Sequence, residues 1–459
     1  MLKIYIPNNN IAEREYIIDT VFGEFLGINY DIKVEGRREK AEENNWVIEL
    51  ENENKLIIKD NFFNKFPKDL EYLKEENIPK NIEFAKSKFA PGSDIPVIYG
   101  DTNIKQEKSC ITCGIDIFAS IYFMLSRWEE YVNKSRDSHN RFLANKSLAY
   151  KFGFLKRPIV NEYLEMLKSM LLELGFRGEF KKREYKLTLT HDVDHIFAWD
   201  SPKKFLMRLG GDIIKKRANI ADIFKAFLEY GKVLSKRAKD PFDSFDYIMD
   251  LSDKIGVKSH FFFMGQGSSK YDNDYYSGSK AAKELAAKIK KRGHLIGIHP
   301  TYNAYNDSIQ FKKEKEELER NLDTKIEFGR EHYLRFSMPK TWQVWEDNSM
   351  KWDSTLSYGE EEGFRCGVCY EYRVFNFLTR EHLKLKEKPL IFMDATGIEK
   401  YNPKQMKDAI FNLISQVERY QGEFVFLWHN SNYNTIKWKE YKSVYEDVIN
   451  YHYKKFNKG

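Results

Sequence analysis

From Leu187 onward the sequence alternates short apolar segments with amphipathic ones, and this alternation restricts the possible folds more than any other feature. In Lys280–Arg292 and Pro403–Tyr420, apolar residues recur every three or four positions, as they do on one face of a helix. Strands that alternate with helices predict an α/β fold with a parallel sheet, open or closed into a barrel, whose site residues lie at the carboxyl ends of the strands. The expected strands are Leu187–Thr190, Ser259–Met264, His294–Ile298, Tyr333–Ser337, Pro389–Met393 and Glu423–Trp428.

The pattern of residues 1–180 predicts a smaller, mixed α/β domain that precedes the alternating strands and helices. Strand-like alternation or helical spacing marks Leu2–Ile6, Lys55–Lys59, Phe118–Trp128 and Asn161–Leu174. The polar stretch Gly178–Glu184 separates the two patterns. We therefore expect two domains, residues 1–180 and residues 181–459.

Composition excludes several classes of protein. The 459 residues are 42% apolar and 15% aromatic, which is too much core-forming material for a disordered chain. A formal charge of +6 is too small for nucleic-acid binding to be the main activity. Four cysteines cannot supply the disulfide framework of a secreted scaffold, and no segment looks like a signal peptide or a membrane span. We expect a cytoplasmic protein.

Several expected strands end in residues of the types that often act in catalysis or bind metals: Asp, His and Arg. Asp192 and Asp194 follow the first strand, and alternate residues of an extended segment point to the same side, so the two carboxylates would converge. Converging carboxylates repel one another unless they bind a cation. A solvated turn, or a histidine that only forms structural hydrogen bonds, is the alternative at each position. The other strand ends carry His299, Arg335, Asp394 and His429.

These strand ends resemble the successive motifs of the polysaccharide deacetylases, carbohydrate esterase family 4, which share the NodB homology domain. The resemblance covers about Tyr185 to Tyr453, and the whole chain looks like a bacterial branch of that family with an extra N-terminal domain. It implies a distorted (β/α) barrel of about seven parallel strands, preceded by the smaller mixed α/β domain. The motifs are Thr190-His191-Asp192-Val193-Asp194, Gly293–His299, Arg335–Pro339, Asp394 and Leu427-Trp428-His429, with Ser259–Phe263 similar to the aromatic second strand.

The resemblance implies a catalytic role for four of these residues. Asp192 matches the general base and His429 the general acid. Arg335 would hold the base in position and Asp394 the acid, contacts that fix charge and tautomer.

The resemblance also implies a divalent metal, usually zinc, bound by one aspartate and two histidines. Asp194 is the nearest carboxylate and His299 the first imidazole. The usual consecutive aspartates are separated here by Val193, so base and ligand could exchange roles. The second histidine is replaced by Asn303, a poorer zinc ligand, which leaves open a weaker site, Mn²⁺ or Mg²⁺, a substitute ligand such as His191 or His195, or no metal.

The function that the resemblance implies is a metal-dependent hydrolase that removes an acyl group, N-acetyl in the simplest case, from a sugar or glycan intermediate of surface-polysaccharide synthesis. Sugar rings stack on aromatic side chains, although most aromatic residues in such a chain belong to the core. The alternative is a catalytically degenerate barrel that binds glycan or protein without turnover. The candidate sugar-binding residues are Tyr302, Trp342, Tyr358 and Trp428.

Two weaker patterns remain. The four cysteines form two CxxC pairs, Cys110–Cys113 and Cys366–Cys369, which would make a zinc clasp if they met but otherwise are buried thiols or a redox pair. Residues 203–239 interleave Lys and Arg with apolar residues, as expected of a contact with a membrane surface or lipid-linked glycan, or of solvated helices over the barrel. Nucleic-acid binding by this segment is a third hypothesis for the function.

Overall fold

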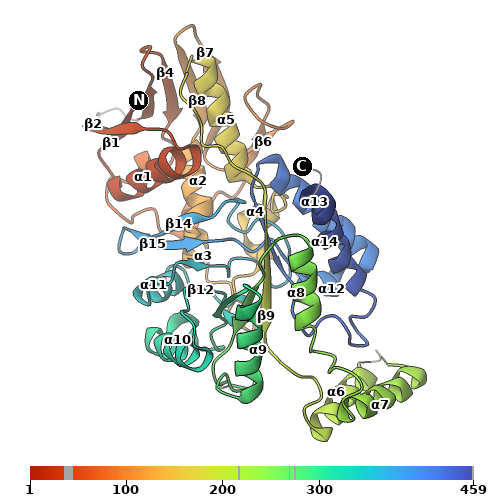
Figure 1. Cartoon of the computed structure of the whole chain (residues 1–459). Helices are drawn as coiled ribbons and strands as arrows, with labels where there is room; N and C mark the ends of the chain where they lie inside the picture. Colours follow the sequence, from red (N-terminus) through yellow and green to blue (C-terminus); the bar gives the residue numbers. More distant parts are fainter. Residues whose placement is uncertain (36–44, 216–217, 268, 273–274, 457–459) are drawn as a thin grey trace. The chain divides into compact units, whose positions relative to one another are not determined.

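The structure is a computed structural model that describes residues 1–35, 45–215, 218–267, 269–272 and 275–456 (Figure 1). These residues form two compact units. Unit 1 comprises Met1–Tyr185, Phe336–Pro389 and Gln416–Glu423, and unit 2 comprises Lys186–Arg335, Leu390–Ser415 and Phe424–Gly459. Phe336–Pro389 and Gln416–Glu423 therefore belong to the same unit as the N-terminal residues, although the sequence places them in the domain 181–459.

Unit 1 contains a mixed six-stranded sheet in the order β2-β1-β3-β4-β8-β7. β1 is parallel to β2 and antiparallel to β3, and β4 is parallel to β8. β4 buries Leu56 and Ile58 and exposes its two lysines, so its alternation was readable in the sequence. The strands are β1 (Leu2–Pro7), β2 (Tyr30–Glu35), β3 (Asn45–Glu49), β4 (Lys55–Lys59), β7 (Gly100–Gln106) and β8 (Cys110–Ile115); β5 (Glu83–Ala85) pairs separately with β6 (Ile95–Val97).

The later segments of unit 1 add the strands β14, β15 and β13, of which β14 is antiparallel and β13 parallel to β15. The central helix α2 is buried along its whole length, and its N-terminus is capped by Asp116, which accepts a hydrogen bond from the Ala119 amide. The elements are α1 (Ile11–Ile18), the π-helix Asp19–Leu26, α2 (Ile117–Ser126), α3 (Trp128–Val132), α4 (Leu148–Lys151), α5 (Ile159–Glu173), α11 (Lys340–Asp347), β13 (Trp352–Asp353), β14 (Tyr372–Asn376) and β15 (Glu381–Glu387).

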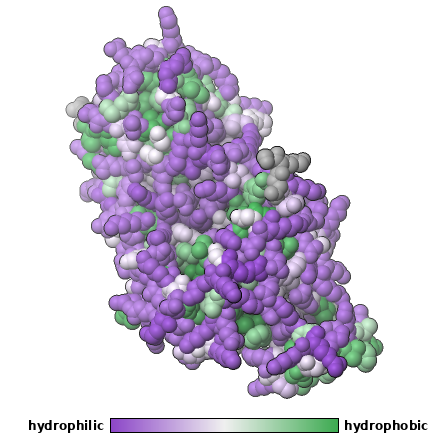
Figure 2. All heavy atoms as spheres, viewed as in Figure 1, coloured by the Kyte–Doolittle hydropathy of each residue, from purple (hydrophilic) through white to green (hydrophobic). Residues whose placement is uncertain are grey.

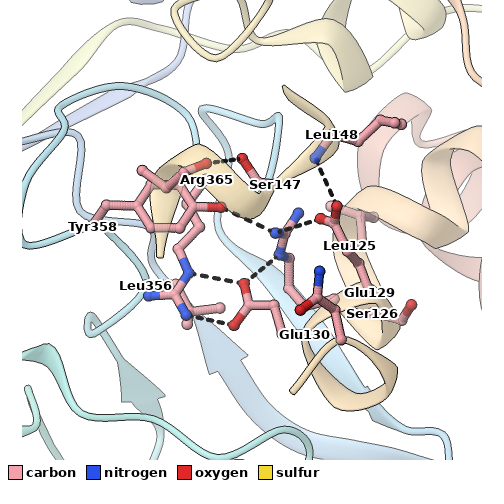
Figure 3. A network of polar contacts seen from close by, with 12 residues as sticks. Leu125, Ser126, Glu129, Glu130, Ser147, Leu148, Leu356, Tyr358 and Arg365 are labelled. Atoms are coloured by element: carbon pink, nitrogen blue, oxygen red, sulfur yellow. Dashed lines mark hydrogen bonds and ion pairs between the residues drawn. The ribbon is translucent and has the colours of Figure 1, made fainter. Parts of the chain in front are cut away.

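A buried ionic network joins the first and second segments of unit 1 (Figure 3). The guanidinium of Arg365 donates two hydrogen bonds to Glu130, at 2.9 and 2.5 Å. Arg127 also donates to Glu130, at 2.9 Å, and to the hydroxyl of Tyr358, at 3.2 Å. Glu129 accepts a hydrogen bond from the Leu148 amide, at 2.6 Å. Because these charged side chains are almost wholly buried, they depend on one another for compensation.

Unit 2 contains the parallel sheet that the sequence predicts, in the order β12-β11-β10-β9-β17-β16. Registered parallel pairs join β9 to β10, β10 to β11, β11 to β12 and β16 to β17. The α/β architecture is confirmed, but the order is linear, and no pairing among the described residues closes it into a barrel. The strands are β9 (Lys186–Val193), β10 (His260–Phe263), β11 (Leu295–Ile298), β12 (Phe328–Gly329), β16 (Phe392–Met393) and β17 (Glu423–Leu427).

The expected strand Tyr333–Ser337 is wrong. The strand that follows β11 along the chain is β12, which has only two residues and ends four residues before Tyr333. His332–Leu334 instead forms a single helical turn in which Tyr333 and Leu334 have φ of 60° and 54°. A left-handed backbone cannot continue a strand, and Leu334 instead packs in a core with Leu390, Val425 and Leu427.

The helices of unit 2 include α9 and α13, which occupy almost the ranges that their apolar spacing predicts. No helix among the described residues is long and apolar enough to span a membrane. The helices are α6 (Pro202–Ile214), α7 (Ile220–Leu234), α8 (Phe245–Lys254), α9 (Lys280–Lys291), α10 (Ser308–Leu322), α12 (Asp394–Lys400), α13 (Pro403–Arg419) and α14 (Lys442–Phe456).

Candidate active site

Strand β9 carries Asp192 near its carboxyl end, and the partner of this carboxylate is Arg330. Arg330 is fully buried; its Nη1 donates to Asp192 Oδ1 at 2.9 Å and its Nη2 to Thr190 Oγ1 at 3.0 Å. The sequence assigned this role to Arg335. That guanidinium lies instead between the rings of Tyr302 and Tyr305, 3.9 and 4.0 Å from their centroids. The guanidinium that neutralises Asp192 is therefore that of Arg330.

Asp194 follows β9 and is surrounded by three imidazoles. Its Oδ1 lies 3.4 Å from His299 Nε2 and 3.9 Å from His332 Nε2, and its Oδ2 lies 3.8 Å from His429 Nε2. Oδ1 is buried and has no hydrogen-bond partner. Burial alone would raise the pKa of this carboxyl, but the contact with His299 and the other neighbouring imidazoles outweigh burial and lower the pKa. Asp194 is therefore an ionised ligand candidate.

His299 follows β11 directly, as the sequence predicts, and its ring is oriented by the backbone. Its Nδ1 donates to the carbonyl oxygen of Arg330, at 2.7 Å. This contact leaves the Nε2 lone pair directed toward the aspartates, with Asp194 Oδ1 at 3.4 Å and Asp192 Oδ2 at 3.8 Å. Fixing one ring nitrogen so that the other can bind a metal is the usual arrangement for a ligand histidine.

His332 is the residue that sequence reasoning missed. It begins the turn after β12, it is buried, and its Nε2 faces Asp194 while its Nδ1 lies 3.6 Å from Asp272 Oδ1. Burial lowers the pKa of His332, which favours the neutral form that binds metals. The left-handed backbone of Tyr333 and Leu334 directly after it stores strain, as often occurs at functional sites.

Asp194, His299 and His332 together fit a metal ion. Among the described residues they form a group whose ligand atoms all lie within 4.8 Å of one another. Ligands about 2.1 Å from a tetrahedral zinc lie roughly 3.4 Å apart, close to the distances from Asp194 Oδ1 to the two imidazoles. One carboxylate with two imidazoles is a donor set that suits zinc and leaves positions for water and substrate. The unpartnered Asp194 Oδ1 also fits a site that is completed by another group.

The other ligand candidates lie outside this group. Asn303 is exposed and lies outside the group that contains His332. His191 is buried between the Trp428 carbonyl and the Ser259 hydroxyl, which occupy both of its ring nitrogens at 2.6 and 3.1 Å. The ring of His195 stacks on Phe242. None of these three side chains belongs to the cluster.

His429 follows β17, and Asp394 holds it in place. Asp394, at the start of α12, contacts His429 Nδ1 through Oδ1 at 2.7 Å and accepts from the His429 amide through Oδ2 at 2.8 Å. Asn432 donates a further hydrogen bond to Asp394 Oδ2, at 2.8 Å. Burial alone would lower the pKa of His429, but the charge and hydrogen bond of Asp394 raise it to about 10. The imidazole is therefore cationic, with Nε2 directed toward Asp194.

Comparison with known proteins gives one family model and several distant structures. The model, described as "Family of unknown function (DUF7033)", matches residues 2–175. No curated protein matches the chain. The matching structures include a putative polysaccharide deacetylase from Mycobacterium smegmatis, at 13% identity over 59% of this chain and 85% of that chain, with a TM-score of 0.36.

Two further structures belong to the same group. A carbohydrate esterase family 4 pseudoenzyme from Bacillus anthracis is 10% identical over 58% of this chain and 62% of its own, with a TM-score of 0.29. A polysaccharide deacetylase from Bacillus cereus is 11% identical over 58% and 89%, with a TM-score of 0.27. Because these scores are low, the matches carry no conclusion about the function of this chain.

The aromatic residues that the sequence selected fall into different environments. Tyr302 is half-buried in unit 2 and stacks on Tyr271, with the ring centroids 4.5 Å apart. Trp428 is buried and donates its indole N–H to the Asn432 carbonyl. Trp342 and Tyr358 are buried in unit 1, where Trp342 donates to Glu387 and Tyr358 accepts from Arg127. Of the four, Tyr302 is the side chain that is only partly buried.

None of the four cysteines belongs to the candidate metal site. Cys113, Cys366 and Cys369 are buried and Cys110 is half-buried, and all four are free thiols in unit 1. Burial raises the pKa of Cys113 and Cys366 to about 12. No group of cysteines in the part of the chain that the structure describes has the spacing of a metal site.

Proposed function

We propose that this chain is a metal-dependent hydrolase that removes an acyl group, an N-acetyl group in the simplest case, from a sugar. The observation that carries the proposal is the cluster of Asp194, His299 and His332, which lies beside a second carboxylate and a cationic imidazole. A ligand set, a base and an acid that lie this close together are the requirements of metal-assisted amide or ester hydrolysis.

Asp194, His299 and His332 would hold the metal. When bound, a divalent ion at this position polarises the acyl carbonyl and makes water a stronger nucleophile near neutral pH. The two imidazoles favour Zn²⁺ over Mg²⁺, and Mn²⁺ remains compatible with the donor set. The backbone contact of His299 and the contact of His332 with Asp272 hold the two rings in place.

Asp192 is the general base in this proposal. Its Oδ1 is held by Arg330, and its Oδ2 lies on the side of His299 and accepts the proton of the attacking water. The buried guanidinium of Arg330 forms an ion pair with this carboxylate at 2.9 Å. A base in this position must be charged before the reaction begins.

His429 is the general acid. Its Nδ1–H is held by Asp394, which leaves the Nε2–H to protonate the leaving amine or alcohol. Asp394 in turn accepts from two amides and from Asn432, and these donors stabilise its charge. The acid is thus protonated and oriented in the resting protein.

We place the substrate among glycans or glycan intermediates of surface-polysaccharide synthesis. Tyr302, Tyr271 and Tyr333 form a group of aromatic rings beside His332, with centroids 4.5 to 5.6 Å apart, and these rings are only partly buried. Such rings suit the apolar face of a sugar. A non-catalytic binding module is less favoured. The reason to consider one is that Asn303 replaces the second metal histidine, and His332 supplies that imidazole instead.

The test combines metal content with turnover. Protein reconstituted with zinc should hold about one ion, which is lost in Asp194→Ala, His299→Ala and His332→Ala but kept in the matched control Asn303→Ala. Asp192→Asn and His429→Ala should keep the metal while acetate release from N-acetylated oligosaccharides falls by roughly 10²–10⁴-fold. Metal retained by all three ligand variants, or wild-type rates in both catalytic variants, would contradict the proposal.

A further inference from the structure

The helical hairpin α6–α7 of unit 2 has a composition unlike the rest of the chain. Residues 202–239 contain eleven Lys and Arg against three Asp and Glu, a formal charge of +8 in a chain whose total charge is +6. Lys216 and Arg217, which belong to this stretch, lie outside the described residues. The positive charge of the protein is therefore concentrated in this one segment.

The hairpin also exposes large apolar side chains. Ile220 is 87% exposed, Ile214 82% and Phe224 66%. Figure 2 shows apolar surface where Figure 1 draws α6 and α7. On α7, Ile220, Phe224, Phe227 and Leu228 recur every three or four positions, and Leu234 follows seven residues after Phe227, so these residues form one stripe. The exposed apolar residues of the hairpin are Leu206, Met207, Ile213, Ile214, Ile220, Phe224, Phe227, Leu228 and Leu234.

Packing within the hairpin does not account for this stripe. Phe205, Leu209, Ala226 and Tyr230 form a separate core in which α6 and α7 contact each other, with the rings of Phe205 and Tyr230 stacked at 4.1 Å. An ordinary surface helix has one apolar face, toward its core. Here α7 has a second one that faces solvent. A single exposed apolar residue such as Ile309, on α10, needs no explanation, but a contiguous set does.

The hairpin is also connected to the candidate active site. A cavity of about 450 Å³ lies between α6, α7 and the loop 431–439 that follows His429. Five Lys and Arg side chains and three Asp and Glu side chains are among the residues that line it, which gives a net charge of +2. Asn432, which donates to Asp394, lines it as well. A surface bound by the hairpin would thus lie beside a cationic cavity that ends at the residues holding the general acid.

We propose that the α6–α7 hairpin binds the surface of an anionic lipid bilayer, with its apolar stripe inserted among the headgroups and its lysines and arginines on the phosphates. This combination of a basic segment with exposed aliphatic and aromatic residues is typical of interfacial amphipathic helices. A nucleic acid would use the charge but not the apolar stripe. A second copy would bring two surfaces of charge +8 together. Anionic lipid satisfies both features at once.

The proposal deepens the proposed function, on which it rests in one respect. If the chain is a sugar deacylase, binding at the bilayer selects lipid-linked sugars, whose phosphates match the lysines of the cavity. Binding to the bilayer itself does not depend on catalysis, so the two proposals can fail separately.

The test is cosedimentation of the full chain with vesicles of equimolar phosphatidylglycerol and phosphatidylcholine, and with vesicles of phosphatidylcholine alone. We expect binding to the anionic vesicles that weakens as salt increases. The double variant Ile220→Ser/Phe224→Ser should bind about tenfold more weakly, because two inserted side chains are lost. Ile309→Ser, an equally exposed isoleucine on α10, is the matched control and should bind like the wild type.

A charge variant and an inactive variant complete the experiment. Lys225→Glu/Lys232→Glu should reduce binding to the anionic vesicles, and Asp192→Asn should bind them like the wild type, whatever its activity. Absence of binding to anionic vesicles would overturn the proposal. So would an Ile220→Ser/Phe224→Ser variant, folded by circular dichroism, that binds as well as Ile309→Ser. Loss of a dimer in that variant, without vesicle binding by the wild type, would assign the stripe to self-association.

Discussion

Arg330 pairs with the carboxylate of the candidate base, Asp192. We predict that Arg330→Leu lowers kcat/KM by roughly 10–100-fold, because Asp192 loses the guanidinium that holds its carboxylate in place. The free energy of unfolding should also fall by about 3–5 kcal/mol, because a buried carboxylate is left uncompensated. Steady-state kinetics and urea titration measure the two effects.

Arg335→Leu is the control for this prediction. Arg335 stacks on Tyr302 and Tyr305 and donates to the Tyr302 carbonyl, so its loss should raise KM more than it lowers kcat. A larger loss of kcat in Arg335→Leu than in Arg330→Leu would return the role to Arg335, as the sequence motif suggested.

His191 makes stability depend on pH. Burial lowers the pKa of His191 to about 4, whereas an unfolded histidine has a pKa of about 6.5. The unfolded chain therefore binds the proton more readily, and the free energy of unfolding should fall as pH decreases from about 6.5 to about 4, by roughly 3 kcal/mol in total from this residue. Urea titrations across this range on the wild type and on His191→Gln should show a smaller loss in the variant. Equal losses would contradict the prediction.

The residues differ in how far their sequence context reveals them. His299 and His429 each follow an apolar run directly, so their position at a strand end could be predicted. His332 follows a two-residue strand and precedes two left-handed residues, a local conformation that no periodicity indicates. Arg330 and Arg335 lie five positions apart, and only the β11–β12 register, in which Ile298 pairs with Gly329, places Arg330 beside β9.

Strand β12 illustrates how an element positions the site. A Cβ at Gly329 would lie 1.9 Å from the Ile298 carbonyl oxygen, so β12 could not keep its distance from β11. We predict that Gly329→Ala costs about 1–3 kcal/mol of stability and displaces Arg330 and His332, which follow on the same chain. Zinc affinity and turnover should fall together, as measured by competition with a chelating dye and by acetate release.

Gly231→Ala is the matched control for that substitution. Gly231 lies within α7, and a Cβ there meets nothing within 4 Å. Alanine should stabilise the helix by about 0.5–1 kcal/mol and leave zinc affinity unchanged. Unchanged zinc affinity in Gly329→Ala would show that the position of His332 does not depend on the close contact between β11 and β12.

Across the whole molecule, the order of elements could be predicted from the sequence but their distribution between the units could not. The polar stretch 178–184 ends one residue before Tyr185, the last residue of unit 1 before unit 2 begins. The return of Phe336–Pro389 to unit 1 depends on contacts between residues far apart in the sequence, such as the pair Arg365–Glu130. Helical and strand periodicity report local structure and contain no information about such pairs.

This distribution predicts that residues 181–459 do not form an independent domain. The fragment would keep Arg365 but lose Glu130, an unpaired buried charge that costs about 3–5 kcal/mol. It would also expose apolar residues of β14, such as Val374 and Phe375, that are buried in unit 1. We expect the fragment to aggregate or to lack a cooperative unfolding transition, and coexpression with residues 1–180 to restore a soluble complex. Size-exclusion chromatography and thermal circular dichroism measure this, and a monomeric, cooperatively folded fragment would show that residues 1–180 are dispensable for the fold of the sheet in unit 2.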